Sequence, residues 1–255
     1  MSSVLAVARS TFREAVRDRV LFLVVAFGIA VLALSRLLSP IALGEGSRIT
    51  VDLGLAALGL LGVFIVALVG TNLVHKEIDR RTIYMVLSRP VSRASYLVGK
   101  WLGLTVTMGV AVSAMGLVLM GVGWLTRGAV IVPPIAQAVF LVICGNAVLA
   151  SLAVLFSSLS TPVLSTLYTL GLYASGYWTA DVREFAGQLG GFPAAMLRSV
   201  SYALPNLELF NLRSQVAHST GADGLHLALA LAYAAAYATA ALALAVVAFE
   251  RRELK

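Results

Sequence analysis

The chain has 255 residues, of which 60% are hydrophobic and only 12% are charged. A soluble domain carries about 25% charged residues, so this composition excludes a soluble globule and predicts an all-α polytopic membrane protein. The formal net charge of +7 is attributed to membrane topology and not to nucleic-acid binding, because the basic residues flank apolar stretches and no nucleic-acid-binding module is recognisable.

Residues 1–19 predict an amphipathic helix that lies at the membrane interface. Apolar side chains recur every four residues, at Val4, Ala8, Phe12, Val16 and Val20. A basic stripe lies beside them, formed by Arg9, Arg13 and Arg17. We expect the apolar face to rest in lipid and the arginines to point toward phosphates or water. Contact of this helix with a cytosolic partner is the alternative interpretation.

Six apolar stretches follow, each close to the roughly 20 residues that a membrane-spanning helix requires. They are residues 20–38, 52–74, 101–125, 135–157, 161–179 and 225–249. The last stretch is rich in alanine, and small side chains let helix backbones approach closely in lipid. We therefore expect it to pack on neighbouring helices and not to lie at the lipid edge of the bundle.

Basic residues indicate the orientation of the spans. With the N-terminus inside, 13 Lys and Arg residues fall on the inner side and 6 on the outer side. Because cytoplasmic segments are enriched in Lys and Arg, we expect a multi-pass protein of the inner (cytoplasmic) membrane with both termini in the cytoplasm.

Residues 180–224 are the longest predicted extracytoplasmic segment. Large apolar side chains alternate there with glycines and prolines, which predicts one or two short helices that lie on the outer leaflet or re-enter it. The segment either caps the bundle or takes part in substrate release or in contact with an extracytoplasmic partner of unknown kind.

The predicted spans contain no recognisable catalytic or cofactor-binding motif. No His-Glu zinc motif exists, the three histidines lie in loops or at interfaces, and no GxxxxGK[ST] phosphate-binding loop is present. We expect no enzyme activity, metal or cofactor in this chain. Five polar residues of the fifth stretch are candidates for lining a transport path, and we favour the alternative that they form hydrogen bonds between helices. They are Tyr168, Thr169, Tyr173, Ser175 and Tyr177.

The charge-dense segment 75–100 is predicted to form a cytoplasmic loop. Four charged residues fall within one to one and a half turns of predicted helix and so point to different sides: Glu77, Asp79, Arg80 and Arg81. Pro90 removes a backbone donor and ends that helix. The loop is either an element that couples the spans to a partner or a solvated basic loop that anchors the topology.

The residue order in this loop resembles the first cytoplasmic loop of type 2 ABC exporter permeases, the NosY-like branch in particular. The matching motifs are Glu77-x-x-Arg80-Arg81-Thr82-Ile83, Leu87-Ser88-Arg89-Pro90-Val91-Ser92-Arg93 and Gly99-Lys100. In outline the resemblance covers the whole chain, including the N-terminal helix and the residues that end the sixth stretch, Phe249-Glu250-Arg251-Arg252.

This resemblance implies the membrane-spanning subunit of an ATP-binding cassette exporter. Two such subunits, expected to be a homodimer, or one such subunit with a related partner, would each dock a soluble ABC-type ATPase subunit. ATP and Mg would bind to those two ATPase copies. The coupling helix would contain Glu77, Asp79, Arg80, Arg81 and Thr82. The turn behind that helix would hold Arg89, Pro90 and Arg93.

The same resemblance places the N-terminal helix where the family has its connecting helix, and it maps the family's outer re-entrant helices to residues 185–215. Arg81 departs from the pattern, because many members carry glycine there. A membrane scaffold or assembly subunit that never moves cargo is the alternative function.

Overall fold

Helices make up every regular element in the part of the chain that the computed structural model describes, which is residues 3–38, 46–71, 92–189 and 191–250. The all-helical prediction is therefore confirmed for these residues. The longer helices are α1 (Ser3–Val16), α2 (Arg19–Leu38), α3 (Gly46–Phe64), α6 (Arg93–Arg127), α7 (Val132–Leu159), α8 (Pro162–Tyr177), α9 (Thr179–Gln188), α10 (Gly191–Ala203) and α12 (Gly224–Glu250). Shorter elements are η2 (Ile65–Gly70), η3 (Ala129–Ile131), η4 (Glu208–Phe210) and α11 (Arg213–Ala217).

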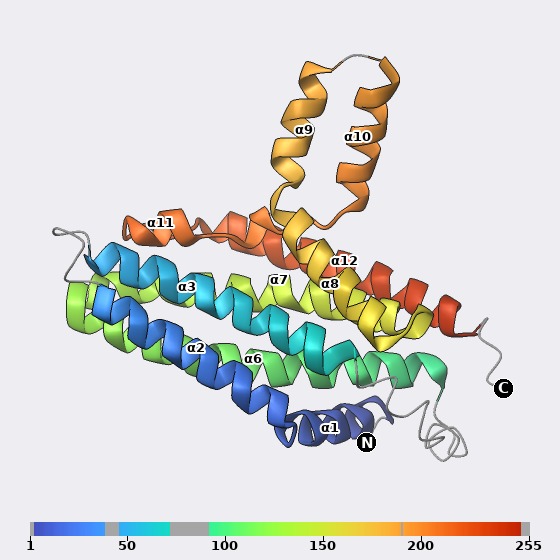
Figure 1. Ribbon diagram of the computed structural model, residues 1–255, viewed down its shortest axis with the longest axis horizontal. Helices are drawn as coiled ribbons and strands as arrows, with labels where there is room; N and C mark the ends of the chain where they lie inside the picture. The colour runs from blue at the N-terminus through green and yellow to red at the C-terminus, as the bar shows by residue number, and fades with distance from the viewer. Residues whose placement is uncertain (1–2, 39–45, 72–91, 190, 251–255) are drawn as a thin grey trace.

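Helix α7 occupies the centre of the bundle, where it packs against α12, α6, α8 and α3 (Figure 1). Its buried positions include small residues such as Ala138, Gly145, Ala150 and Ala153. Lipid is as apolar as a leucine side chain, so helices in a membrane associate through close packing, and small residues permit it.

Helix length divides the six predicted spans into two groups. Within the described ranges, four helical segments are long and apolar enough to cross a membrane: Gly46–Gly70, Arg93–Arg127, Ala129–Leu159 and Gly224–Phe249. The apolar part of α2 is shorter, Leu21–Leu34. Helix α8 has 16 residues, which gives about 24 Å at 1.5 Å per residue and falls short of the roughly 30 Å hydrocarbon core. The count of six crossings stays a prediction.

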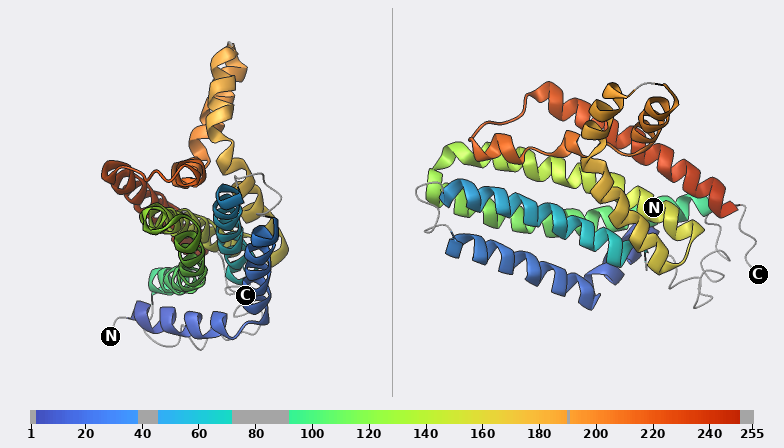
Figure 2. Two further views of the ribbon diagram at one scale, coloured as in Figure 1. Left: turned by 90° about the vertical axis from the view of Figure 1, so that its left-hand side faces the viewer. Right: turned by 45° about the horizontal axis from the view of Figure 1, so that its top comes forward.

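Helix α1 lies across the end of the bundle, nearly perpendicular to the long helices (Figure 2). It packs on α6, where Gly99 and Gly103 let the two backbones come close. A Cβ atom on Gly103 would lie 2.7 Å from the carbonyl oxygen of Ala8, and one on Gly99 would lie 3.0 Å from that of Val4. The expectation that the apolar stripe rests in lipid is wrong for Val4 and Ala8, which pack against α6, whereas for Val16 of the same stripe, which is exposed, it stays a prediction.

Helix α12 buries one stripe of alanines, which includes Ala230, Ala234 and Ala245, and it packs mainly on α7. The other faces of the helix expose Leu229, Leu244 and further residues. The expectation that alanine richness keeps this helix away from the bundle edge therefore holds for one face only. Alanines at every third or fourth position are sufficient for one close contact, and most of the remaining alanines are exposed.

Helices α9 and α10 form an antiparallel hairpin that leaves the side of the bundle and stands roughly perpendicular to the long helices (Figures 1 and 2). Ala186 and Ala194 are buried, and the Arg183 guanidinium lies 5.3 Å from the centroid of the Tyr202 ring. The described part of segment 180–224 contains these two helices and the shorter α11, one more helix than the sequence predicts. Their position relative to the outer leaflet stays a prediction.

The contact of α1 with α6 gives a first testable prediction. Gly103→Ala should lower the free energy of unfolding by about 1–3 kcal/mol, because the added methyl group overpacks against the α1 backbone. Gly121→Ala on the same helix is the matched control, since nothing lies within 4 Å of a Cβ there, and it should be neutral or stabilising by up to about 1 kcal/mol.

Thiol labelling reports the same contact directly. Cys144 is the chain's only cysteine and is buried, so a Thr11→Cys thiol can be followed selectively. Its labelling rate should rise in the Gly103→Ala background. Equal stability and equal labelling in the two glycine variants would contradict the close packing of α1 on α6.

Candidate functional site

The predicted coupling loop falls almost entirely outside the described residues. Those outside are Glu77, Asp79, Arg80, Arg81, Thr82, Arg89 and Pro90. Arg93, the eighth predicted residue, is the first residue of α6, and the Ser92 side chain caps that helix by accepting a hydrogen bond from the Ser95 N–H. The structure therefore describes the helix into which the loop runs.

Arg93 ties the start of α6 to the end of α12. Its Nη1 donates a 2.9 Å hydrogen bond to the carbonyl oxygen of Phe249, and its guanidinium lies 5.6 Å from the centroid of the Phe249 ring. The Tyr96 ring stacks on the same phenylalanine at 6.3 Å between centroids. A guanidinium satisfies carbonyls that a helix C-terminus leaves unpaired, so this contact stabilises the end of α12.

Lys100 connects the same region to α1. Its side chain is only 2% exposed, with Nζ 3.8 Å from the Glu14 carboxylate and 5.7 Å from the centroid of the Tyr96 ring. A buried ammonium group is costly unless it is paired, which explains why a carboxylate of α1 faces it. We call Glu14, Arg93, Tyr96, Lys100 and Phe249 together the terminal junction, because it joins α1, the start of α6 and the end of α12.

The basic stripe of α1 faces away from this packing. Arg9, Arg13 and Arg17 are exposed and line a shallow groove with Glu14, whereas Phe12 is half-buried. These arginines are placed where phosphates, water or a partner protein can reach them.

A second polar region lies where α8 ends at Tyr177. The chain leaves the bundle there as the α9–α10 hairpin and returns at Pro205. The Leu207 N–H donates a 3.0 Å hydrogen bond to the Gly176 carbonyl oxygen, and the Asn206 N–H donates one of 2.9 Å to the Tyr233 hydroxyl. The hairpin is therefore an excursion whose two ends are held together at the bundle surface.

After its return the chain continues along α7 without forming a long helix. Leu207, Phe210 and Leu212 are buried, and the Phe210 ring rests on Gly145, where a Cβ would lie 3.2 Å from the ring. Within a membrane, non-helical backbone is tolerated only where it is buried in protein or lines a cavity. The short α8 and the segment 204–212 together form what we call the broken span.

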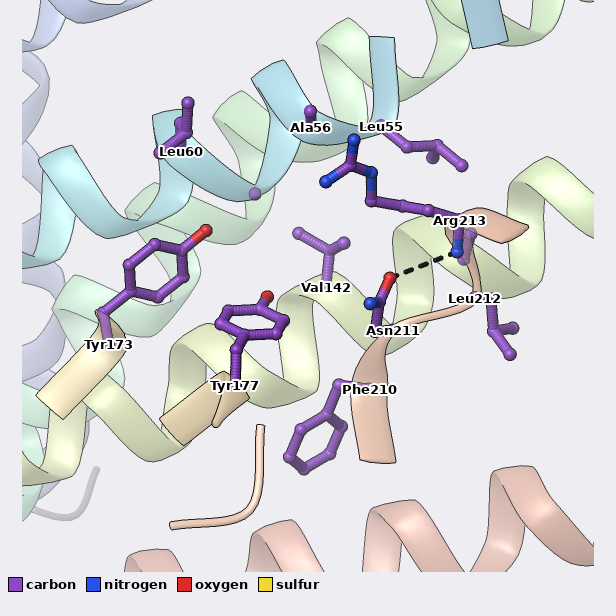
Figure 3. A pocket seen from close by; sticks show the side chains of 12 residues that line it. Leu55, Ala56, Leu60, Val142, Tyr173, Tyr177, Phe210, Asn211, Leu212 and Arg213 are labelled. Carbon is purple, nitrogen blue, oxygen red and sulfur yellow. Dashed lines mark hydrogen bonds between the residues drawn. The ribbon is translucent and has the colours of Figure 1, made fainter. Parts of the chain in front are cut away.

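A cavity of about 230 Å³ lies between the broken span, α3 and α7 (Figure 3). Its walls include Tyr173 and Tyr177 of α8, Leu55 and Leu60 of α3, and Val142 of α7. Arg213 extends over it and pairs with Asp52 of α3, with Nε to Oδ1 at 3.1 Å and Nη2 to Oδ2 at 3.0 Å. This two-pronged ion pair ties α11 to α3 at the rim of the cavity.

The candidate path residues of the fifth stretch have different surroundings. Tyr173 and Tyr177 line the cavity. Tyr168 is exposed and packs on Phe156, whereas the Thr169 and Ser175 hydroxyls donate to carbonyls of their own helix. Two of the five candidate path residues therefore line the cavity.

Sequence reasoning missed Thr166, which makes the contact between helices in this region. Its hydroxyl donates to the Ala67 carbonyl oxygen at 3.1 Å and lies 2.9 Å from the Thr71 hydroxyl, beside the π-helical turn η2. The Ser157 hydroxyl donates to the Thr71 carbonyl oxygen at 3.0 Å. A π-helical turn disturbs the regular helical hydrogen bonds, and these hydroxyls bond to one carbonyl on that turn and one directly after it. In the sequence Thr166 is one hydroxyl-bearing residue among several in the same stretch, so nothing singles it out.

No group of three or more His, Cys, Asp or Glu residues that could hold a metal ion occurs in the described ranges.

Comparison with known families supplies one match. A family model described as "ABC-2 family transporter protein" matches residues 5–254, a range that includes the terminal junction, the cavity and the hairpin. A search of the curated proteins finds no match.

The base of the hairpin can be tested with a pair of glycines on α8. A Cβ on Gly176 would lie 2.6 Å from Leu207 Cγ and 3.0 Å from the Pro205 carbonyl oxygen, whereas nothing lies within 4 Å of one on Gly171. Gly176→Ala should therefore lower the free energy of unfolding by about 1–3 kcal/mol through overpacking. Gly171→Ala should not lower the free energy of unfolding. Equal denaturation midpoints for both variants would refute this description of the broken span.

Proposed function

The chain belongs to the ABC-2 transporter family, and from this premise we propose that it is the permease subunit of an ATP-driven exporter of the NosY-like branch. In this proposal it forms the membrane path and is driven by a separate soluble ATPase subunit. The observation that carries the proposal is the family match over residues 5–254, together with the motif-bearing loop that leads directly into α6.

Contact with the ATPase is assigned to the loop before α6. Glu77, Asp79, Arg80, Arg81 and Thr82 form the proposed contact, and the turn holding Arg89 and Pro90 connects it to α6. The arrangement of the terminal junction supports this assignment. Arg93 binds the end of α12 and Lys100 pairs with Glu14 of α1, so a force on the loop acts on three helices at once.

The proposed assembly contains two permease copies and two ATPase copies, with ATP and Mg on the ATPase. Both termini and the loop face the cytoplasm, and the complex lies in the inner membrane. The excess of basic residues on that side supports this orientation.

The proposed mechanism follows from a two-state bundle. Closure of the ATPase dimer around ATP moves the loop, and the helices tilt so that the path opens outward. ATP shifts this equilibrium only to the extent that it favours one state over the other. The cargo class that suits apolar, sparsely charged spans is a hydrophobic or amphipathic molecule.

Co-purification tests the partner. The tagged chain, extracted in mild detergent, should retain a soluble P-loop ATPase, and the purified complex should hydrolyse ATP. A chain that purifies without a nucleotide-hydrolysing companion, or whose conformation does not respond to ATP, would favour the non-transporting scaffold instead.

A charge reversal tests the contact itself. Glu77→Lys should weaken ATPase binding at least about tenfold, or about 1.4 kcal/mol, because it places a like charge where an attractive one is expected. Glu184→Lys, an exposed position on α9, is the matched control and should leave ATPase binding and turnover unchanged. Unchanged binding by the Glu77 variant would remove that residue from the contact.

A further inference from the structure

Helix α1 is held against the bundle by one face. A Cβ on Gly103 of α6 would lie 2.6 Å from the Cβ of Thr11, and Thr11 and Ala15, one turn apart on α1, are both buried. Successive residues of a helix are about 100° apart around its axis, so the residue two positions after Thr11 lies about 200° away from it. That residue is Arg13, and its side of α1 therefore points away from α6.

Two further arginines share this outer face. Arg9 lies one turn before Arg13, Arg17 directly follows the end of the helix, and all three are exposed and line one shallow groove. The described residues give none of their guanidinium groups a hydrogen bond or an ion pair. The acidic residue that lines the groove is Glu14, and its carboxylate lies 3.8 Å from Lys100 Nζ. Lys100 offsets that negative charge, so the groove presents three positive charges.

Helix α1 lies beside the point where α6 becomes free of charge. No charged residue occurs from Trp101 to Thr126, and the charged residue just before this stretch, Lys100, is the one that pairs with α1. The membrane boundary on α6 therefore falls next to α1. Because α1 is nearly perpendicular to the long helices (Figure 2), it runs parallel to the membrane surface, and its outer face points sideways along the layer of lipid head groups.

The two flanks of α1 agree with this depth. On one side of the arginines lie Leu5 and Val16, which are apolar and 53% and 38% exposed. On the other side lie Ser10 and Glu14, which are polar and exposed. An apolar flank suits hydrocarbon and a polar flank suits water, so the arginines between them lie at the depth of lipid phosphates.

We propose that the outer face of α1 binds the phosphate groups of anionic phospholipids. Guanidinium groups form two-pronged hydrogen bonds with phosphate, and clusters of basic residues at a membrane surface attract anionic lipids. Arg9 and Arg13 are about 6 Å apart along the helix at 1.5 Å per residue, and Arg17 continues this row. A row of cations matches a layer of head groups, whereas an ATPase that approaches from the water would meet the flank with Ser10 and Glu14 first.

This lipid site goes beyond the proposed function, because binding requires neither the ATPase nor transport. The purified chain alone is therefore sufficient to test it, and a failure of the lipid site would leave the proposed ATPase partner untouched.

Short-chain phosphatidylglycerol and phosphatidylcholine provide the test, because both carry a phosphate but only phosphatidylglycerol has a net negative charge. Titrated into the chain in neutral detergent, phosphatidylglycerol should raise the unfolding temperature in a saturable way, with an apparent Kd at least tenfold lower than that of phosphatidylcholine. Arg13→Gln should weaken phosphatidylglycerol binding about fivefold, the contribution of one basic residue near an anionic surface. Replacement of all three arginines by glutamine should abolish the preference.

Two controls separate lipid binding from folding. Arg198→Gln removes the same charge from an exposed position on α10, so this variant should bind phosphatidylglycerol like the parent. In lipid-free detergent the triple variant should unfold at the same temperature as the parent, because the three guanidinium groups have no partner in the described ranges. A triple variant that unfolds earlier without lipid would assign the arginines to the fold and overturn the proposal.

Nanodiscs decide between the possible occupants of the outer face. The parent should be more stable in phosphatidylglycerol than in phosphatidylcholine nanodiscs, and added salt should reduce the difference. Equal stability in the two lipids would overturn the proposal. So would inorganic phosphate that stabilises the parent in phosphatidylcholine as much as phosphatidylglycerol does, since the site then takes a soluble anion. A triple variant that keeps its lipid preference but no longer retains the ATPase would assign the face to that protein instead.

Discussion

The bilayer core has no water to satisfy a backbone N–H or C=O, and this constraint governs the architecture. Long helices satisfy it internally, which is why α3, α6, α7 and α12 run across the bundle with little interruption. Where the backbone departs from a helix, the groups that are released find partners within the protein. Thr166 and Ser157 contact carbonyls around η2, and Tyr233 accepts a bond from Asn206 where the hairpin returns.

The terminal junction joins three helices with few polar groups. Glycines at 99 and 103 bring the α1 backbone onto α6, and the pair of Lys100 with Glu14 fixes the register of that contact. Arg93 adds α12 by donating a hydrogen bond to the Phe249 carbonyl oxygen near its end. Buried charge is costly without a partner, so each charged group here joins two helices instead of facing lipid.

The broken span borders a place where polar groups and free space meet in the interior of the bundle. The chain leaves the bundle after α8 as the hairpin and returns as an irregular segment, and a cavity lies between Tyr173, Tyr177 and α3. Gly59 lines both this cavity and the recess beside Asn146, and Gly62 gives the Asn146 amide its room.

Sequence alone determined the helical membrane class, because composition decides whether a chain can dissolve in water, and it determined the family through the loop motifs. It also identified Tyr173 and Tyr177 as polar groups in an apolar stretch. It did not identify α1 as the partner of Gly99 and Gly103, or Asn146 as the lining of a recess beside the cavity. Local spacing specifies which face of a helix is small or polar, whereas only the packing of distant segments decides what that face meets.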